Sequence, residues 1–440
     1  MSIYEMIKRN TYFLNIKFIV LAAMALVSCR SNDLYRPPRV TSFRGEALPA
    51  PPGMVYVPSG TILYKSTQDS ASVGKYISLS AFFIDETEVT NRQYREFVNW
   101  VADSIAVTDY LNDDQYFLEQ EATTDSSGHS GRAINWGKVK KRSPLWQSDD
   151  PNIQERLRPM ISYEGGNKTL KKELIKYRFS YLKMGGANHD RYVTDTVSAM
   201  PDEKVWSEDF PNAQLTSMDD NYFNHEAFDA YPVVGVTWKQ ARAYADWRGK
   251  ELMAQVFKHS YLKGTKLTFS LPTEAQWQYA AEARLNPEDT SSGTRWTIDD
   301  RKTKKKKLAI NFKQEEGNYS RDGATFTVPV KSYAANAFGV YNMAGNVSEW
   351  TLDAFSPSAI AFVNDLNPAL LYDADENSSS LLKRKVVRGG SWKDNGPMLN
   401  SETRNYEQDD VAHSYIGFRC VMSAFEIITD QVKTRKYKSE

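Results

Sequence analysis

The chain has 440 residues, 41% of them hydrophobic, so it can hold one large or two ordinary domains around a sizeable core. Its 55 basic and 55 acidic residues balance to a net charge of zero, which argues against nucleic acid as the main partner. The 10 Trp, 25 Tyr and 20 Phe indicate a core or a surface rich in aromatic side chains.

The N-terminus predicts a lipoprotein signal peptide at 1–28. Basic residues precede a short apolar run, 18–27, which is too short to span a bilayer as a mature helix. Small residues then lead to Cys29, as in a bacterial lipobox, where cleavage leaves the cysteine as a lipid-modified first residue. The alternative is a plain secretory signal with an incidental cysteine. Arg30 follows Cys29, which resembles the pattern for export to the outer membrane.

Residues 29–52 predict an extended tether, because this polar segment carries five prolines. It joins the lipid anchor expected at Cys29 to the folded domain. Cys420 is the other cysteine of the sequence. With Cys29 lipidated, no intramolecular disulfide can form, so the domain relies on its core, on metal or on partners.

The regular elements begin with two predicted strands, at 53–60 and 76–84. Three helices are predicted to start at Thr90, Thr237 and Thr273. Each threonine is followed three residues later by glutamine, the reciprocal arrangement of a capping box. Apolar residues repeat behind each cap at helical spacing, so each helix has an apolar stripe for the core.

Two polar segments, about 104–230 and 356–383, are predicted to be insertions into this core. The first shows little periodicity, and a loop of such length in a compact domain is usually functional or disordered. We expect one short helix in it, near 170–182. The core resumes after the second insertion, and 415–422 predicts the final strand. Residues 424–440 form a charged tail that we expect to fray.

The stretch 339–351 is the predicted centre of the domain, and it is too irregular for a helix or strand. Asn342, Gly345, Asn346 and Glu349 place amide oxygens, a carboxylate and a backbone-exposing glycine close together. A hard cation such as calcium prefers oxygen ligands from side chains and from carbonyl groups of tight turns. The alternative is a buried polar turn held by hydrogen bonds alone.

Seven motifs occur in the order of a known family. They are Gly-Met-Val-Tyr-Val-Pro-Ser-Gly (53–60), Phe-Ile-Asp-Glu-Thr-Glu-Val-Thr-Asn (83–91), Tyr-Pro-Val-Val-Gly-Val-Thr-Trp (231–238), Leu-Pro-Thr-Glu-Ala-Gln-Trp (271–277), Gly-Val-Tyr-Asn-Met-Ala-Gly-Asn-Val-Ser-Glu-Trp (339–350), Arg-Gly-Gly-Ser-Trp (388–392) and Gly-Phe-Arg (417–419). Together they resemble the sulfatase-modifying-factor family, which includes the formylglycine-generating enzyme. The resemblance covers 53–423. It implies a mixed α/β (α+β) fold related to C-type-lectin-like folds, with few regular elements and long loops.

The resemblance also implies two calcium sites. The first set of ligands is the side chains of Asn342 and Glu349 with the carbonyl groups of Gly345 and Val347. The second set, where the spacing departs from the family's pattern, is Asn311, Phe312, Asp322 and Ala324.

The family's catalytic pattern is absent, so we assign no catalytic residue. In the enzyme one cysteine lies three residues after the serine of Arg-Gly-Gly-Ser, and a second lies five further on. Asp394 and Leu399 occupy these positions. Copper(I) needs thiolate ligands, so we expect no copper. A related branch of the family resembles a histidine-ligated iron enzyme, but the five histidines lack that spacing, so we expect no iron. These histidines are His129, His189, His225, His259 and His413.

A closer resemblance is to the gliding-motility and type IX secretion lipoproteins of Bacteroidetes. The GldK/PorK type fits best, through the blocks at 85–91, 344–350 and 383–394 behind the lipobox; the GldJ type is a near relative. It implies a non-catalytic ring or scaffold subunit, lipid-anchored on the periplasmic face of the outer membrane. Its partners would be further copies of itself and a GldN/PorN-type protein. Two alternatives are a family oxidoreductase or oxygenase acting on an exported substrate, and a glycan-binding surface protein.

Overall fold

The structure is a computed structural model that divides into two units, Met1–Arg44 and Gly45–Glu440. It describes residues 46–47, 50–66, 74–118, 123–124, 130–139, 143–164, 167–185, 191–256, 268–283, 297–299, 306–424 and 426–427. The predicted signal peptide, Cys29 and most of the predicted tether and tail lie outside the described residues. Everything below concerns the second unit.

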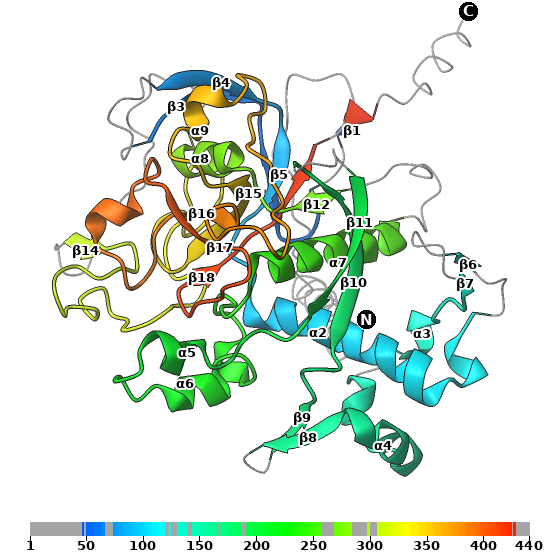
Figure 1. The fold of residues 1–440 in the computed structure, drawn as a ribbon. Coiled ribbons are helices and arrows are strands. Elements are labelled where there is room, and N and C mark those ends of the chain that lie inside the picture. The colour runs from blue at the N-terminus through cyan, green and yellow to red at the C-terminus, as the bar shows by residue number, and fades with distance from the viewer. Residues whose placement is uncertain are drawn as a thin grey trace, which may run out of the picture. The chain divides into compact units, whose positions relative to one another are not determined.

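Two four-stranded sheets lie at the centre of this unit (Figure 1). The first is antiparallel, in the order β12 (Phe269–Ser270), β19 (Val421–Ser423), β5 (Phe82–Asp85), β2 (Met54–Val57). The second has the order β17 (Asn405–Gln408), β16 (Arg384–Arg388), β15 (Ser348–Ala354), β18 (Ile416–Gly417). In it β15 and β18 are parallel, whereas the other pairs are antiparallel. Both sheets therefore join segments from distant parts of the chain.

Three capped helices pack around these sheets, as the sequence predicts. They are α2 (Asn91–Ile105), α7 (Trp238–Val256) and α8 (Glu274–Glu282). Thr90 and Thr273 form complete capping boxes. Thr237 forms the same reciprocal pair, since Gln240 N donates to its hydroxyl and its own N–H donates to the Gln240 side chain. Among the described helices, none has the length and apolar character needed to cross a membrane.

Short elements complete the fold. The hairpins are β3 (Gly60–Tyr64) with β4 (Lys75–Leu79), β6 (Thr123–Thr124) with β7 (Ser130–Gly131), β8 (Ile161–Glu164) with β9 (Asn167–Leu170), β10 (Lys176–Lys183) with β11 (Arg191–Ser198), and β13 (Thr297–Asp299) with β14 (Lys306–Leu308). β1 (Glu46–Ala47) pairs with β20 (Glu426–Ile427). The short helices are α3 (Trp136–Val139), α4 (Pro151–Leu157), α5 (Val205–Asp209), α6 (Thr216–Asn221) and α9 (Ala359–Phe362). Single turns are η1 (Ala106–Leu111), η2 (Asp114–Tyr116), η3 (Leu145–Gln147), η4 (Arg158–Met160), η5 (Glu226–Phe228) and η7 (Gly396–Leu399).

Three sequence expectations are wrong in detail. The helix expected near 170–182 is instead the end of β9 and most of β10, because Tyr177, Phe179 and Tyr181 alternate with polar residues at the period of a strand. The strand expected at 76–84 is two strands, β4 and β5, which belong to different sheets. The final strand expected at 415–422 is divided in the same way, with β18 in one sheet and β19 in the other.

Aromatic side chains fill the core between α2, α7 and the sheets. Tyr94 stacks on Tyr244 with ring centroids 5.5 Å apart, and the edge of Phe418 contacts both rings. The three side chains come from α2, α7 and the chain before β19 and are buried. The aromatic composition of the sequence therefore serves this core, where such pairs contribute beyond their buried area.

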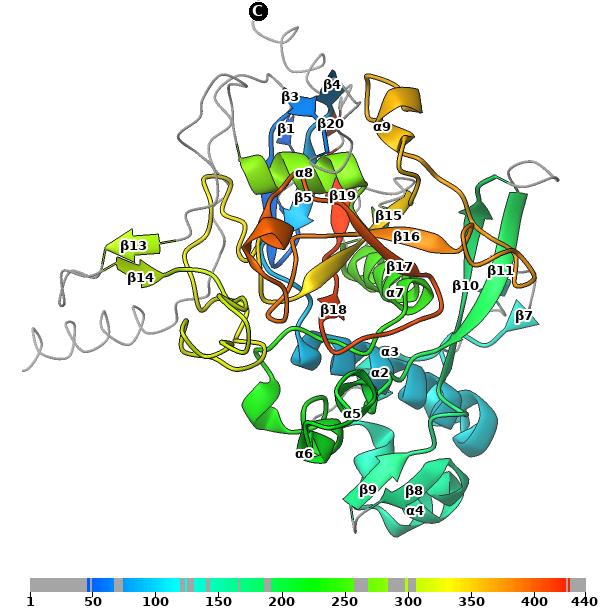
Figure 2. The ribbon, with the colours of Figure 1, turned by 60° about the vertical axis from the view of Figure 1, so that its left-hand side comes forward.

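The first insertion is fixed to the core through His413. Its Nδ1 lies 2.6 Å from Asp209 of α5, and its Nε2 lies 3.0 Å from Glu407 of β17. Asp209 also accepts from the backbone N–H and hydroxyl of Ser414. In Figure 1 and Figure 2, α5 and α6 lie below β18. The part of the insertion around α5 is therefore held in place by charge-assisted hydrogen bonds.

Candidate metal-binding loops

The predicted central stretch is an irregular loop, 339–347, that leads directly into β15. Gly339, Asn342, Gly345 and Asn346 have φ values of 85°, 51°, 76° and 60°. Glycine and asparagine tolerate this left-handed region, so the sequence is suited to the loop. The expectation of irregular structure is confirmed for this loop and is wrong for 348–351, which belongs to β15.

Gly345 allows this loop to touch the segment that carries the second predicted set. A Cβ atom at Gly345 would lie 2.3 Å from the carbonyl oxygen of Asn311. Asn346 N donates to that same oxygen at 2.9 Å, and Asn311 Nδ2 lies 3.3 Å from Asn346 Oδ1. The fold therefore brings the two predicted sets side by side, although Asn342 follows Asn311 by 31 positions in the sequence.

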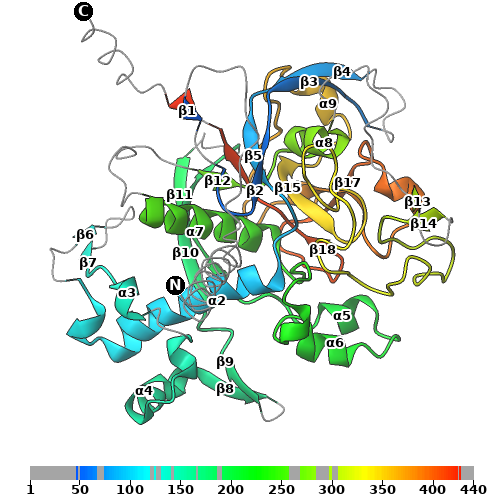
Figure 3. The ribbon, with the colours of Figure 1, turned by 180° about the vertical axis from the view of Figure 1, so that it is seen from behind.

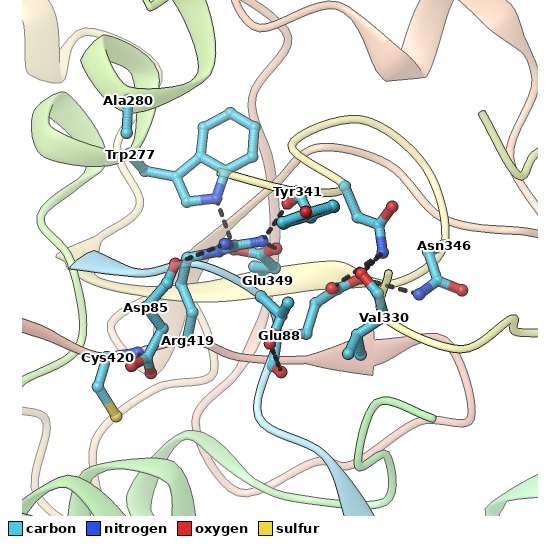
Figure 4. Close-up of polar contacts among 12 residues, drawn as sticks. Asp85, Glu88, Trp277, Ala280, Val330, Tyr341, Asn346, Glu349, Arg419 and Cys420 are labelled. Carbon is cyan, nitrogen blue, oxygen red and sulfur yellow. Dashed lines mark hydrogen bonds and ion pairs between the residues drawn. The ribbon is translucent and has the colours of Figure 1, made fainter. Parts of the chain in front are cut away.

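Glu349 lies at the centre of a buried ion pair (Figure 4). Arg419 donates to both of its carboxylate oxygens, from Nε at 2.7 Å and from Nη2 at 2.6 Å. Trp277 of α8 donates its indole N–H to Glu349 at 2.8 Å. All three side chains are fully buried. Glu349 thus joins α8, β15 and the chain before β19 through buried hydrogen bonds.

Arg419 also ties down the loop itself. Its Nη2 donates to the carbonyl group of Tyr341 at 2.9 Å, and its Nη1 donates to that of Asp85 at 3.0 Å. The Gly-Phe-Arg motif at 417–419 therefore contributes a guanidinium group that spans three segments. The motif draws attention to Arg419 in the sequence, but the spacing of residues does not show that Glu349 is the partner of Arg419.

Glu88 is a second buried carboxylate at the loop, and residue-by-residue reasoning did not single it out. It accepts from Asn342 Nδ2 at 3.1 Å and from Asn346 Nδ2 at 2.9 Å. It is fully buried. Burial raises the pKa of Glu88 to about 7, with Glu349 adding to the rise and Arg419 opposing it. Glu88 belongs to the family motif at 83–91, and this is the feature of the sequence that points to it. The sequence alone does not show that this motif contacts the loop 339–347.

In this structure, Asn342 and Glu349 of the first calcium set already bind other protein groups. The carboxylate of Glu349 already faces a guanidinium group, and Asn342 directs its amide N–H groups at Glu88 and at the carbonyl group of Val330. The buried positive charge beside Glu349 is thus supplied by Arg419. A calcium ion at this set would have to share Glu349 with Arg419, so these residues fit a metal poorly as they are arranged.

The second calcium set fits a metal better. Asp322 is buried, and this burial raises its pKa. It accepts from Phe312 N at 2.9 Å and from Ala324 N at 3.1 Å. Gln314 Nε2 lies 3.3 Å from it, while the buried Gln314 Oε1 finds no hydrogen-bond partner among the residues that the structure describes. An oxygen-seeking cation beside Asp322 would satisfy that acceptor and neutralise the carboxylate.

We expect calcium to raise the melting temperature of the protein and Asp322→Asn to abolish that rise. At a calcium concentration a hundred times the dissociation constant, the stabilisation would be about 2.7 kcal/mol. Thermal melts with calcium and with chelator provide the measurement. Glu316→Gln, which removes an exposed carboxylate nearby, serves as the control and should keep the response. Identical melts of the unmodified protein under both conditions would rule out the metal.

The pKa of Glu88 predicts a pH dependence of stability. Its folded value, about 7, lies above the value of 4.5 of an unperturbed glutamate, so the folded state holds this proton more tightly. Stability should therefore fall as pH rises from about 4.5 to 7, by at most about 1.4 kcal/mol per pH unit for one proton. Glu88→Gln cannot titrate and should lose this part of the decline.

Urea unfolding of both proteins at pH 5, 6, 7 and 8 provides the test. Asp353, whose pKa burial also raises to about 7, contributes equally to both proteins and cancels in the difference. A difference that stays constant with pH would contradict the assignment to Glu88.

Asp394 and Leu399, at the positions of the family's catalytic cysteines, make contacts that hold the local structure. Asp394 Oδ2 accepts from Ser391 N at 2.9 Å and from Ser391 Oγ at 2.6 Å, which closes a local turn. Leu399 is buried in an apolar cluster. Asp394 lies on a cleft of about 420 Å³, lined with Phe210, Lys313, Tyr319, Lys393, Asn395 and Met398.

Cys420 does not replace those thiols. It is fully buried, just before β19 rather than inside a strand, and its N–H donates to Asp85 at 2.8 Å. Burial raises the pKa of its thiol well above the usual value, so it is held as an unreactive thiol.

A further buried charged cluster lies at the first turn of α8. Glu274 accepts from Arg388 Nη1 at 2.8 Å and from Arg404 Nε at 2.7 Å and Nη2 at 2.9 Å. The three side chains are at most 2% exposed. Burial alone would raise the pKa of Glu274, but Arg404 and Arg388 outweigh it and hold the pKa below its usual value. This cluster joins α8 to β16 and to the chain before β17.

Comparisons with known proteins agree with the sequence motifs. The model of the sulfatase-modifying factor enzyme 1-like domain matches residues 41–424. The formylglycine-generating enzyme of Streptomyces coelicolor is 32% identical over 200 residues, which is 44% of this chain and 53% of that protein. The inactive Cα-formylglycine-generating enzyme 2 of Bos taurus is 27% identical over 200 residues, 44% of this chain and 51% of that protein.

The chain thus spans about half the length of these curated relatives. Among solved structures, PvdO from Pseudomonas aeruginosa aligns with a TM-score of 0.42 and 17% identity, covering 86% of this chain and 98% of that chain. Both active and inactive proteins occur among the relatives. The prediction of a mixed α/β fold with few helices and long loops is confirmed. The chain belongs to the sulfatase-modifying factor enzyme 1-like family.

Proposed function

We propose that the protein is a non-catalytic lipoprotein that serves as a ring or scaffold subunit of the type IX secretion and gliding-motility machinery under the outer membrane. The observation that carries the loss of catalysis is the replacement of the family's cysteine pair by Asp394 and Leu399. Neither side chain can form a thiolate, which copper(I) requires as ligand and which the family's oxidation of a peptide cysteine depends on. The inactive mammalian relative supports the idea that the fold is retained without the reaction.

The two replacement residues have structural roles that suit a scaffold. Asp394 closes its turn through Ser391, and Leu399 belongs to one buried apolar cluster with Ile310, Phe312 and Ala344. This cluster includes both neighbours of Asn311, so Leu399 helps to pack the segment of the second calcium set. Calcium, when bound there, would supply positive charge that holds Asp322 and its neighbours together.

Membrane attachment rests on Cys29. A lipid-modified Cys29, followed by the proline-rich tether 29–52, would hold many copies of the domain at one surface, where they can meet each other and a GldN/PorN-type partner. The lipoprotein signal supports this placement on the periplasmic face of the outer membrane.

Cys29→Ala tests the anchor directly. We expect the full chain to incorporate a labelled fatty acid and to fractionate with the outer membrane, and we expect the variant to lose both properties because it lacks the acyl acceptor. Ser31→Ala, two residues away, should behave as the unmodified chain. Unchanged labelling of Cys29→Ala would remove the lipid anchor from the proposal.

A further inference from the structure

Among the described residues, no strand pairs with the outer edge of the β10–β11 hairpin. β11 runs from Arg191 to Ser198 and, within the described residues, pairs only with β10. Figure 2 shows β10 and β11 side by side, and in Figure 3 the helix α7 crosses this hairpin and contacts both of its strands. β11 contains no proline or lysine, two of the residue types with which edge strands prevent pairing, and its charged residues are Arg191 and Asp195. The edge is therefore suited to accept another strand.

The hydrogen-bond pattern shows which residues face outward. Ala199 N donates to the carbonyl group of Ile175 at 2.8 Å, at the base of the hairpin. Because hydrogen-bonded pairs alternate along an antiparallel ladder, every second residue from Ala199 directs its N–H and C=O at β10. Tyr192, Thr194 and Thr196 therefore direct theirs away from it. These three residues are exposed, Tyr192 by 71%.

The side chains of β11 are self-complementary about Val193. Arg191 and Asp195 lie two residues on either side of it and share one face of the strand. Within the described part of the chain, the charge of Arg191 acts on Asp375, where it helps Lys183 to lower the pKa of that exposed carboxyl group. Asp195 accepts a hydrogen bond from the N–H of Thr196. If two copies of β11 run antiparallel with Val193 opposite Val193, each Arg191 lies opposite the Asp195 of the other copy.

We propose that β11 pairs with β11 of a second copy of this chain, antiparallel and about a two-fold axis at Val193. The two hairpins then form one four-stranded sheet. Tyr192 and Thr194 of the two copies exchange backbone hydrogen bonds, and the two Arg191–Asp195 pairs occupy sites where opposite side chains lie close together.

This contact goes beyond the proposed function. A two-fold contact uses the same surface on both copies and joins a pair, whereas closing a ring requires a second, different surface. It depends neither on the lipid anchor nor on another protein. Failure of the contact and failure of the secretion role are therefore separate results.

A cysteine at the proposed axis tests the geometry. In Val193→Cys the two cysteines would face each other at a Cα separation of about 4.5 Å, within the range of a disulfide. We expect mild oxidation of the full chain, purified in detergent, to give a reducible dimer. Tyr192→Cys, exposed on the same strand but opposite Thr194, should stay monomeric on a denaturing gel. A Val193→Cys chain that does not crosslink would overturn the proposal.

Charge reversal gives a test that does not depend on crosslinking. Arg191→Asp and Asp195→Arg each place like charges opposite one another twice, and each should raise the dissociation constant of the pair roughly tenfold. The double variant exchanges the charges and should restore association. Sedimentation velocity over a range of concentrations provides the measurement. The proposal is overturned if the unmodified chain stays monomeric, or if the single variants associate as tightly as the unmodified chain. It is also overturned if the double variant does not regain association.

Discussion

Replacing Glu349 by alanine is expected to lower the free energy of unfolding by about 3–5 kcal/mol, the range for breaking one partner of a buried ion pair. The change leaves the guanidinium of Arg419 buried without its carboxylate and the indole N–H of Trp277 without its acceptor. Urea unfolding at neutral pH measures the loss.

Two controls separate this effect from a general sensitivity to charge. Glu315→Ala removes an exposed ion pair with Arg321 and should cost less than about 1 kcal/mol. In the double variant Glu349→Ala with Arg419→Ala, the orphaned charge is gone, so the loss should be smaller than the sum of the two single losses. If the two single losses add up to the loss in the double variant, Glu349 and Arg419 do not act as a pair.

The second large effect is expected for Glu274→Ala, again about 3–5 kcal/mol. This change leaves two buried guanidinium groups, those of Arg388 and Arg404, facing each other without the carboxylate between them. It also removes an acidic residue from the first turn of α8, where a negative charge interacts favourably with the helix dipole. The matched control is Glu402→Ala, whose partner Lys65 is partly exposed, and it should cost less than about 1 kcal/mol.

The pH dependence of the Glu274 effect has a definite sign. The pKa of Glu274 is held below its ordinary value in the folded state, so its contribution to stability is present above the unfolded pKa of about 4.5. It is lost as pH falls through the lower, folded value. Acid unfolding of Glu274→Ala should therefore show a shallower decline below pH 4.5 than that of the unmodified protein. An equally steep decline would assign the acid sensitivity to other groups.

Local signals in the sequence predicted the elements that depend on neighbours in the chain. The capping boxes at Thr90, Thr237 and Thr273 fix three helix starts because both partners lie within four residues. The irregular loop 339–347 was predicted because asparagine and glycine set its left-handed positions locally. The same reasoning failed for β10, where the alternation of Tyr177, Phe179 and Tyr181 was not recognised in a polar segment.

The contacts that build the candidate site could not be predicted from spacing, because they join distant segments. Glu88 meets Asn346 across 258 residues, and Arg419 meets Glu349 across 70. A carboxylate in an oxygen-rich loop suggests a metal ligand, but the buried guanidinium that neutralises it lies in another motif. Family motifs identified each segment, whereas only the fold shows which segments meet.

We propose that this chain keeps the fold of its family for assembly, with Asp394 and Leu399 in place of the family's pair of thiols. The most direct measurement is to purify the full chain gently from membranes, image the particles that contain it, and assay the same sample for oxidation of a cysteine-bearing peptide. We predict large assemblies that contain further copies and a second protein, with no formylglycine formed. A sample of isolated single chains that converts the peptide would contradict this account.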